Sequence, residues 1–119
     1  MNLPRAIGWM LAAVLCTQAH AHTFLDHAEP RVGAVLHAAP AQVELWFTQE
    51  IEPAFSSVKV LDAAGSRVDK ADAQVDPAHR VLLRVSLKPL APGDYKVVWR
   101  AVSTDAHVTG GDFAFHVRP

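Results

Sequence analysis

Short runs that alternate between apolar and polar residues recur along this chain. The clearest lie at 43–47, 57–61, 81–87, 95–102 and 112–117, and they are rich in β-branched and aromatic residues. Proline, glycine, aspartate and serine separate the runs, and these residues favour turns. No window of ten residues after position 21 has the periodicity of an amphipathic helix. The pattern therefore predicts an all-β protein.

The run at 95–102 predicts a strand with one buried face, because Tyr95, Val97, Trp99 and Ala101 occupy alternate positions. Glycine and proline at 63–66 and 91–94 predict tight, hairpin-like connections. About seven strands in about a hundred residues predict a two-sheet sandwich with one core. We expect the aromatic residues to be core and rim residues, namely Trp46, Phe47, Phe55, Trp99, Phe113 and Phe115.

The first 21 residues have the features of a secretory signal peptide. Arg5 supplies positive charge, residues 6–15 are apolar but too short to span a bilayer, and Ala19-His20-Ala21 fits a cleavage site. Cleavage after Ala21 would leave a single domain at 22–119 that begins with His22. Cleavage after Ala19 is the alternative, and it would leave His20-Ala21-His22 as the new terminus.

Composition narrows the function further. The chain has eleven Lys and Arg against twelve Asp and Glu, so basic residues are not in excess. Neither a nucleic acid nor an anionic lipid surface is therefore expected as a partner. Its one cysteine, Cys16, lies in the predicted signal peptide. The exported domain would then contain no disulfide and no thiolate ligand for a metal.

The candidate metal ligands are His22, Asp105 and His107. An amino-terminal histidine offers its amine and its ring nitrogen to the same ion. Asp105 and His107 are two residues apart, so on extended backbone their side chains would project to the same side. An amine, two imidazoles and a carboxylate form a nitrogen-rich set that suits tetragonal Cu(II) better than tetrahedral Zn(II).

Several segments resemble the CopC family of periplasmic copper-resistance proteins. They are His22-x-x-Leu25 with Pro30 and Gly33, the run at 43–47, and Pro92-Gly93-x-Tyr95-x-Val97-x-Trp99-Arg100-Ala101-Val102-Ser103, followed by Asp105-x-His107 and Gly110. The most specific part is 99–107, and the resemblance spans essentially all of 22–119.

The resemblance implies an immunoglobulin-like Greek-key sandwich that carries one Cu(II) in the periplasm without catalysis. It implies His22, Asp105 and His107 as ligands and a CopD-like inner-membrane copper transporter as a possible recipient. Two-site members of the family add a methionine-rich Cu(I) loop. This chain has Asp62, Ser66, Arg67, Asp69, Lys70 and Asp72 in that region, and its two methionines, Met1 and Met10, lie in the predicted signal. A Cu(II)-only member is therefore expected.

Two other functions compete with copper carriage. A terminal histidine with a second histidine also resembles the copper brace of polysaccharide monooxygenases. Asp105, however, would occupy the equatorial position on copper that oxygen activation needs. In a metal-free interaction module, Asp105 would instead cap a turn. Of the remaining histidines, His27 is expected to face solvent or to approach the ion from outside its ligands. We expect His37 and His79 to be exposed, and His116 to face outward from the last strand.

Overall fold

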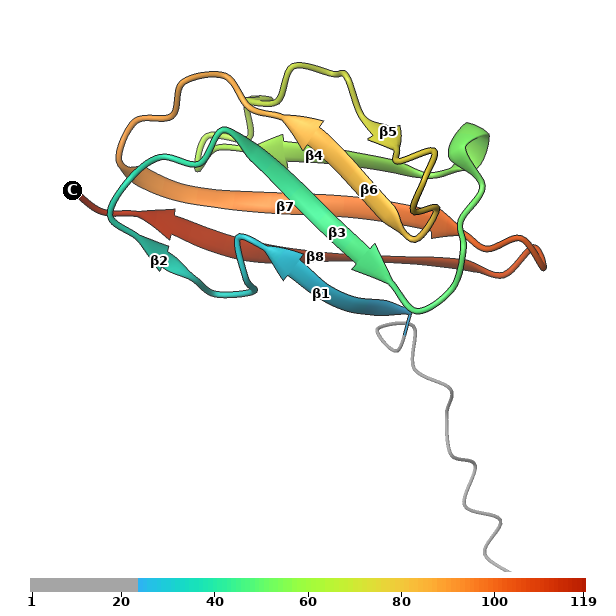
Figure 1. The fold of residues 1–119 in the computed structure, drawn as a ribbon. Helices are drawn as coiled ribbons and strands as arrows, with labels where there is room; N and C mark the ends of the chain where they lie inside the picture. Colours follow the sequence, from blue (N-terminus) through green and yellow to red (C-terminus); the bar gives the residue numbers. More distant parts are fainter. Residues whose placement is uncertain (1–23) are drawn as a thin grey trace, which may run out of the picture.

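The computed structural model describes residues 24–119, which form eight strands and one short 3-10 helix (Figure 1). The strands are β1 (Leu25–Glu29), β2 (Val35–Leu36), β3 (Gln42–Phe47), β4 (Ser57–Leu61), β5 (Gln74–Val75), β6 (Leu82–Ser86), β7 (Gly93–Val102) and β8 (Val108–Val117), and the helix is η2 (Pro53–Phe55). The predicted signal peptide and the boundary at residue 21 lie outside this range.

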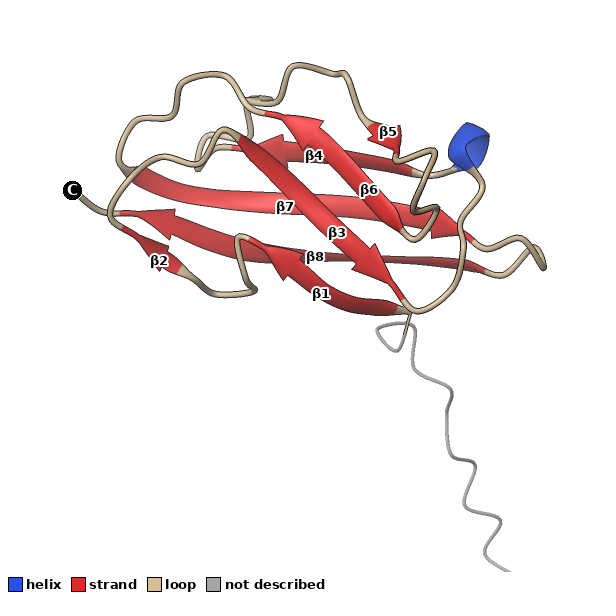
Figure 2. Cartoon of the chain, in the orientation of Figure 1, coloured by secondary structure: helices blue, strands red, loops and turns tan. Residues whose placement is uncertain are grey.

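The strands form two four-stranded sheets that pack face to face. One, the β3 sheet, has the order β1-β3-β6-β5, and the other, the β7 sheet, has the order β2-β8-β7-β4. Consecutive strands β3 and β4 lie in different sheets, as do β6 and β7, which is typical of Greek-key connections. Figure 2 shows strands and loops throughout, apart from η2. The predicted all-β sandwich is confirmed, with two-residue strands β2 and β5 completing the edges.

Strand alternation builds the core between the sheets. In β7, Tyr95, Val97, Trp99 and Ala101 are all buried, while the residues between them are exposed or half-buried. Their neighbours in β8, together with Val43, Leu45 and Phe47 of β3, close the same core. Residues 24–119 contain no cysteine, so no disulfide stabilises this part of the chain. Removal of these apolar side chains from water is therefore the main contribution to the free energy of folding.

The last strand begins earlier than its sequence predicts. Residues 112–117 carry the alternating pattern, yet β8 begins at Val108 and includes Gly110 and Gly111. These glycines pass close to Trp99: a Cβ on Gly111 would lie 3.1 Å from its ring, and one on Gly110 would lie 3.2 Å from its carbonyl oxygen. Glycine here permits close packing within a strand and does not end one.

One of the two predicted hairpin-like connections is also wrong. The turn at 63–66 does reverse the chain, with Gly65 at φ 83° and a bridge between Leu61 and Arg67. The segment at 91–94, however, joins β6 to β7 across the end of the sandwich. The Tyr95 hydroxyl donates a hydrogen bond to the Ala91 carbonyl and fixes this corner.

Across residues 24–119, the structure contains no helix that is long and apolar enough to cross a membrane.

Candidate metal centre

Asp105 and His107 lie in the five-residue loop that joins β7 to β8. The strands remain paired up to Val102 and Val108. Beyond them the Ser103 amide donates to the His107 carbonyl at 2.9 Å, and the Ala106 amide donates to the Ser103 carbonyl at 2.9 Å. Ala106 has a φ of 70°. The loop is therefore a tight turn, and the extended backbone expected for Asp105-x-His107 is wrong.

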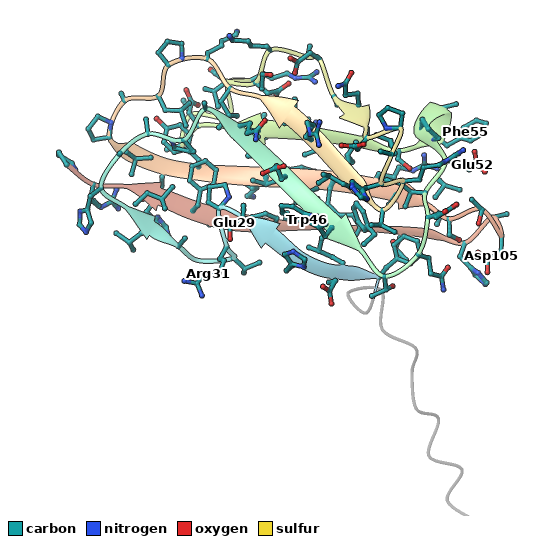
Figure 3. All side chains as sticks on the ribbon, viewed as in Figure 1. Glu29, Arg31, Trp46, Glu52, Phe55 and Asp105 are labelled. Carbon is teal, nitrogen blue, oxygen red and sulfur yellow. The ribbon has the colours of Figure 1, made fainter. Side chains whose placement is uncertain are left out.

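The turn nevertheless brings the two candidate ligands together. Nδ1 of His107 lies 3.1 Å from Oδ1 of Asp105. Both side chains face solvent, with exposed fractions of 57% for Asp105 and 78% for His107. Figure 3 shows Asp105 at the tip of the β7–β8 hairpin, at one end of the sandwich. An ion from solvent can approach both groups without any opening of the core.

Ser103 positions both residues, and sequence reasoning gave it no role. Its side chain is buried, with 1% of the residue exposed. The Ser103 hydroxyl donates to Oδ1 of Asp105 and accepts a hydrogen bond from the His107 amide at 3.2 Å. Its position two residues before Asp105 was visible in the sequence. A serine there has many uses, however, and only the turn points its hydroxyl at both neighbours.

The electrostatics of the loop favour a charged carboxylate. The hydrogen bond from Ser103, and then the contact with His107, hold the pKa of Asp105 below its ordinary value of 3.8. Asp105 is therefore ionised at neutral pH and available to a cation. Because no arginine or lysine forms an ion pair with it in the described range, its charge is not already neutralised by a fixed cation.

The start of the described chain lies at the same end of the sandwich as this loop. The Thr48 amide donates to the Phe24 carbonyl at 2.9 Å, and the Thr104 amide donates to the Glu50 carbonyl at 3.3 Å. Ile51 also forms a bridge with Ser103. The segment after β3 thus connects both places. His22, the third predicted ligand, precedes Phe24 by two residues and lies outside the described residues.

Asp105 and His107 have no further ligand close by within residues 24–119. No group of three or more His, Cys, Asp or Glu side chains in that part of the chain could hold a metal ion. Two donors from this loop leave most positions around an ion open. A tight site therefore needs donors from residues before Phe24, from solvent or from a partner.

The other histidines have separate surroundings. His27 is exposed, as expected, and it stacks on Trp46 with ring centroids 4.5 Å apart, while its Nδ1 lies 2.6 Å from Oδ2 of Asp26. His37 and His79 are exposed, and His116 faces outward from β8 in a half-buried position. The solvent-facing positions predicted for these four histidines are confirmed.

The acidic segment at 61–74 uses its carboxylates to fold its own backbone. Asp62 accepts hydrogen bonds from the amides of Ala64 and Ser66, both at 2.9 Å. The buried Asp69 accepts from the Val60 amide at 2.8 Å and from the Arg67 guanidinium at 2.9 Å. These oxygens are occupied, and the segment contains neither methionine nor cysteine as a soft ligand for Cu(I).

Comparison with known proteins identifies the family. The family model for the CopC domain matches residues 25–118. The chain belongs to the CopC family. The copper resistance protein C of Pseudomonas syringae pv. tomato is 34% identical to it, covering 95% of this chain and 90% of that protein. The copper transport protein CutJ of Bacillus subtilis is 34% identical over 98 residues, but this chain spans only 18% of its length.

Solved structures of the family have the same fold. CopC from Methylosinus trichosporium OB3b matches with a TM-score of 0.75 and 34% identity, covering 81% of this chain and 93% of that one. PcoC from Escherichia coli, described as a methionine-rich copper resistance protein, matches with a TM-score of 0.67 and 30% identity, covering 80% of this chain and 97% of that one. Family membership assigns this chain a copper-related role and places it among copper-binding proteins, not enzymes.

Proposed function

We propose that this protein binds one Cu(II) ion per chain in the periplasm and buffers or carries it. The ligands would be the amine and ring of His22, the carboxylate of Asp105 and the ring of His107. The observation that carries this proposal is the solvent-facing Asp105–His107 pair at the end of the sandwich where the described chain begins. Two further nitrogen donors at the start of a chain cut after Ala21 would complete the set.

The chemistry of these donors favours copper in the Cu(II) state over Cu(I). Imidazole, amine and carboxylate suit Cu(II), whereas Cu(I) prefers thioether or thiolate sulfur. Both methionines and the cysteine precede residue 17 and would leave with the signal peptide. A Cu(II)-only protein follows, and intramolecular transfer to a sulfur-rich Cu(I) site is not part of the proposal.

Delivery to a membrane transporter is the second part of the proposed role. In CutJ, a copper transport protein, the matched region is a small fraction of a much longer chain. That arrangement supports a CopC-like domain working beside a transport component. We propose a CopD-like inner-membrane transporter as the recipient of copper from this chain.

The decisive experiment moves the terminal amine without removing any side chain. Protein that begins at His22 is compared with protein that carries one added glycine before His22, by calorimetric titration with Cu(II) and by electron paramagnetic resonance. We expect tight one-to-one binding with nitrogen-rich axial spectra for the first protein. The added glycine should weaken binding at least about tenfold, because it separates the amine from the imidazole chelate.

Equal affinity and equal spectra for the two proteins would refute the proposed ligand set. Mass spectrometry of the exported protein provides the complementary measurement, since it shows whether the chain begins at His22 or at His20. A start at His20 would create a different chelate, in which His22 is the third residue and Asp105 is not needed.

A further inference from the structure

The outer face of the β7 sheet carries basic residues that are dispersed in the sequence. Lys59 of β4 and Arg100 of β7 are exposed, while Val58, Val60, Trp99 and Ala101 beside them are buried in the core. In the sheet, Ser57 pairs with Arg100 and Lys59 pairs with Val98. Residues about forty positions apart thus meet on one surface. Neither net charge nor any run of basic residues reveals this grouping.

These residues line a shallow hollow of about 320 Å³, which we name the basic hollow. Its polar and charged lining residues are Ser57, Lys59, Arg67 and Arg100, and Val98 contributes an apolar patch. Three cationic side chains and one hydroxyl therefore surround it, and no carboxylate from residues 24–119 lines it. This is the donor set that binds an anionic group.

The charges around the basic hollow are only partly neutralised. Arg67 donates through Nε to the buried Asp69 at 2.9 Å. In the described part of the chain, neither Lys59 nor Arg100 has a carboxylate within ion-pair distance, and Arg100 uses Nη1 to donate to the Phe55 carbonyl at 3.0 Å. Asp112 pairs with Val98 from the opposite side, on β8, and does not line the hollow.

The basic hollow adjoins the candidate metal loop. Arg100 precedes Ser103 by three residues, which corresponds to about 10 Å along a strand. Phe55 lies beside it at the end of η2, with 61% of the residue exposed. Its carbonyl is held by Arg100, and the next residue, Ser56, accepts a hydrogen bond from the Val102 amide at 3.1 Å. Figure 3 shows Phe55 at the same end of the sandwich as Asp105.

We propose that the basic hollow binds an acidic segment of the protein that exchanges copper with this chain. The partner's role rests on the proposed function. A glutamate or aspartate side chain would accept hydrogen bonds from Lys59, Arg100 and Ser57, and a neighbouring apolar residue of the segment would pack on Phe55. Docking there would place the partner about 10 Å from the Asp105–His107 loop.

The shape and charge pattern favour a protein segment over an anionic membrane. Membrane recognition uses clusters of about four to eight basic residues together with an apolar face. Here three cations surround a concave site, and Phe55 is an exposed large apolar residue beside it. Asp112 is exposed on the same sheet face, outside the hollow, and would be repelled by a broad anionic lipid surface.

The test uses a tetraglutamate peptide titrated into isotopically labelled protein, with amide chemical shifts as the readout. We expect the amides of Lys59, Val98 and Arg100 to shift, with an affinity that falls as salt is added. Lys59→Glu should weaken peptide binding at least tenfold. The matched control is Arg31→Glu, an identical charge change between β1 and β2, on the opposite edge of the sandwich, and it should leave peptide affinity unchanged.

Three results would overturn this inference. The first is equal peptide affinity in Lys59→Glu and the unaltered protein. The second is inorganic phosphate binding as tightly as the peptide, which would indicate an adventitious ion only. The third is Lys59-dependent binding to phosphatidylglycerol vesicles without any peptide-induced shifts, which would assign the surface to a membrane.

Copper titration separates this inference from the proposed function. Lys59→Glu should bind Cu(II) with unchanged affinity, because Lys59 is not a ligand. Normal copper binding without peptide binding would refute the basic hollow alone. Peptide binding without tight copper binding would refute the proposed function and, with it, the partner's role in copper exchange.

Discussion

Two aspartate–histidine pairs lie at opposite ends of the β7–β8 hairpin, and their surroundings differ. Asp94 and His116 sit opposite each other on the paired strands, with His116 Nδ1 2.7 Å from Asp94 Oδ1. Arg118 donates to the same oxygen at 2.6 Å. Asp105 and His107 sit in the connecting loop, where the neutral hydroxyl of Ser103 donates a hydrogen bond to Asp105.

The comparison shows that neighbours, and not residue types, decide what such a pair can do. Both carboxyl pKa values lie below 3.8, that of Asp94 through Arg118 first and then His116, and that of Asp105 through Ser103 first and then His107. Asp94 is already partnered by a fixed cation, and the His116 side chain is only 31% exposed. Within residues 24–119 the Asp105–His107 pair has no such cation and faces solvent, so it is the pair suited to a metal ion.

Replacing one histidine in each pair should give the largest difference in Cu(II) affinity between the two pairs. His107→Ala should weaken Cu(II) binding at least about a hundredfold. Altering a residue that only hydrogen-bonds to a metal ligand costs roughly tenfold to hundredfold in affinity, and loss of the ligand itself should cost more. His116→Ala should leave Cu(II) affinity unchanged. Calorimetric titration of both variants measures the difference, and equal losses in the two would contradict the assignment of Asp105–His107 as the copper pair.

Acid should affect copper binding through the nitrogen ligands. Both imidazoles and the terminal amine must lose protons before they bind, so affinity should fall steadily below about pH 6, near the unperturbed histidine pKa. The lowered pKa of Asp105 means that this carboxylate needs stronger acid than an ordinary aspartate before it is protonated. Titrations between pH 7 and pH 4 test the expectation, and a flat profile to pH 4 would contradict these ligands.

Ser103→Ala should have an intermediate effect, because Ser103 positions ligands and does not bind the ion. We expect a loss of about tenfold in Cu(II) affinity, in the range seen for residues that orient metal ligands. The Asp105 pKa in copper-free protein should also rise toward 3.8, and NMR titration measures this. The exposed neighbour Thr104→Ala is the control and should change neither quantity. An unaltered Asp105 pKa in Ser103→Ala would argue against the positioning role.

The Asp94 pair should affect stability and not copper. Because the pKa of Asp94 is lowered in the folded state, its stabilising contribution is present above 3.8 and is lost as pH falls through the folded-state pKa. Asp94→Asn should therefore lower the melting temperature at pH 7 by no more than about 3 °C, since the group is exposed. The difference from the unaltered protein should shrink below pH 3.8. A difference that persists unchanged in strong acid would exclude this ion pair as its cause.

A third pair, Asp26–His27, should show the smallest effect. His27 stacks on Trp46 and contacts Asp26, and neither contact involves the β7–β8 loop. His27→Ala should change Trp46 fluorescence and leave Cu(II) affinity within about twofold. A larger loss of affinity would mean that His27 contacts the copper site after all.

Much of the fold could be predicted from local pattern. The alternation at 95–102 specified which face of β7 is buried, since successive side chains of any strand point to opposite faces. The start of β8 was less predictable, because two glycines lie within the strand. Gly110 and Gly111 resemble a strand break, but close contact with Trp99, a residue ten or more positions away, keeps them within β8.

The candidate site also has some features that the sequence predicts and others that depend on the tertiary structure. Sequence alone determined the ligand types, the separation of Asp105 from His107 and the lack of sulfur donors after residue 16. The tertiary structure decided that Ser103 holds the Asp105 carboxylate and the His107 backbone amide, and that the loop and the start of the described chain share one end of the sandwich. It also brought Lys59 and Arg100 onto one surface. These relations depend on pairing between distant strands, and the energy of such pairing comes from the whole core and is not written in any local run of residues.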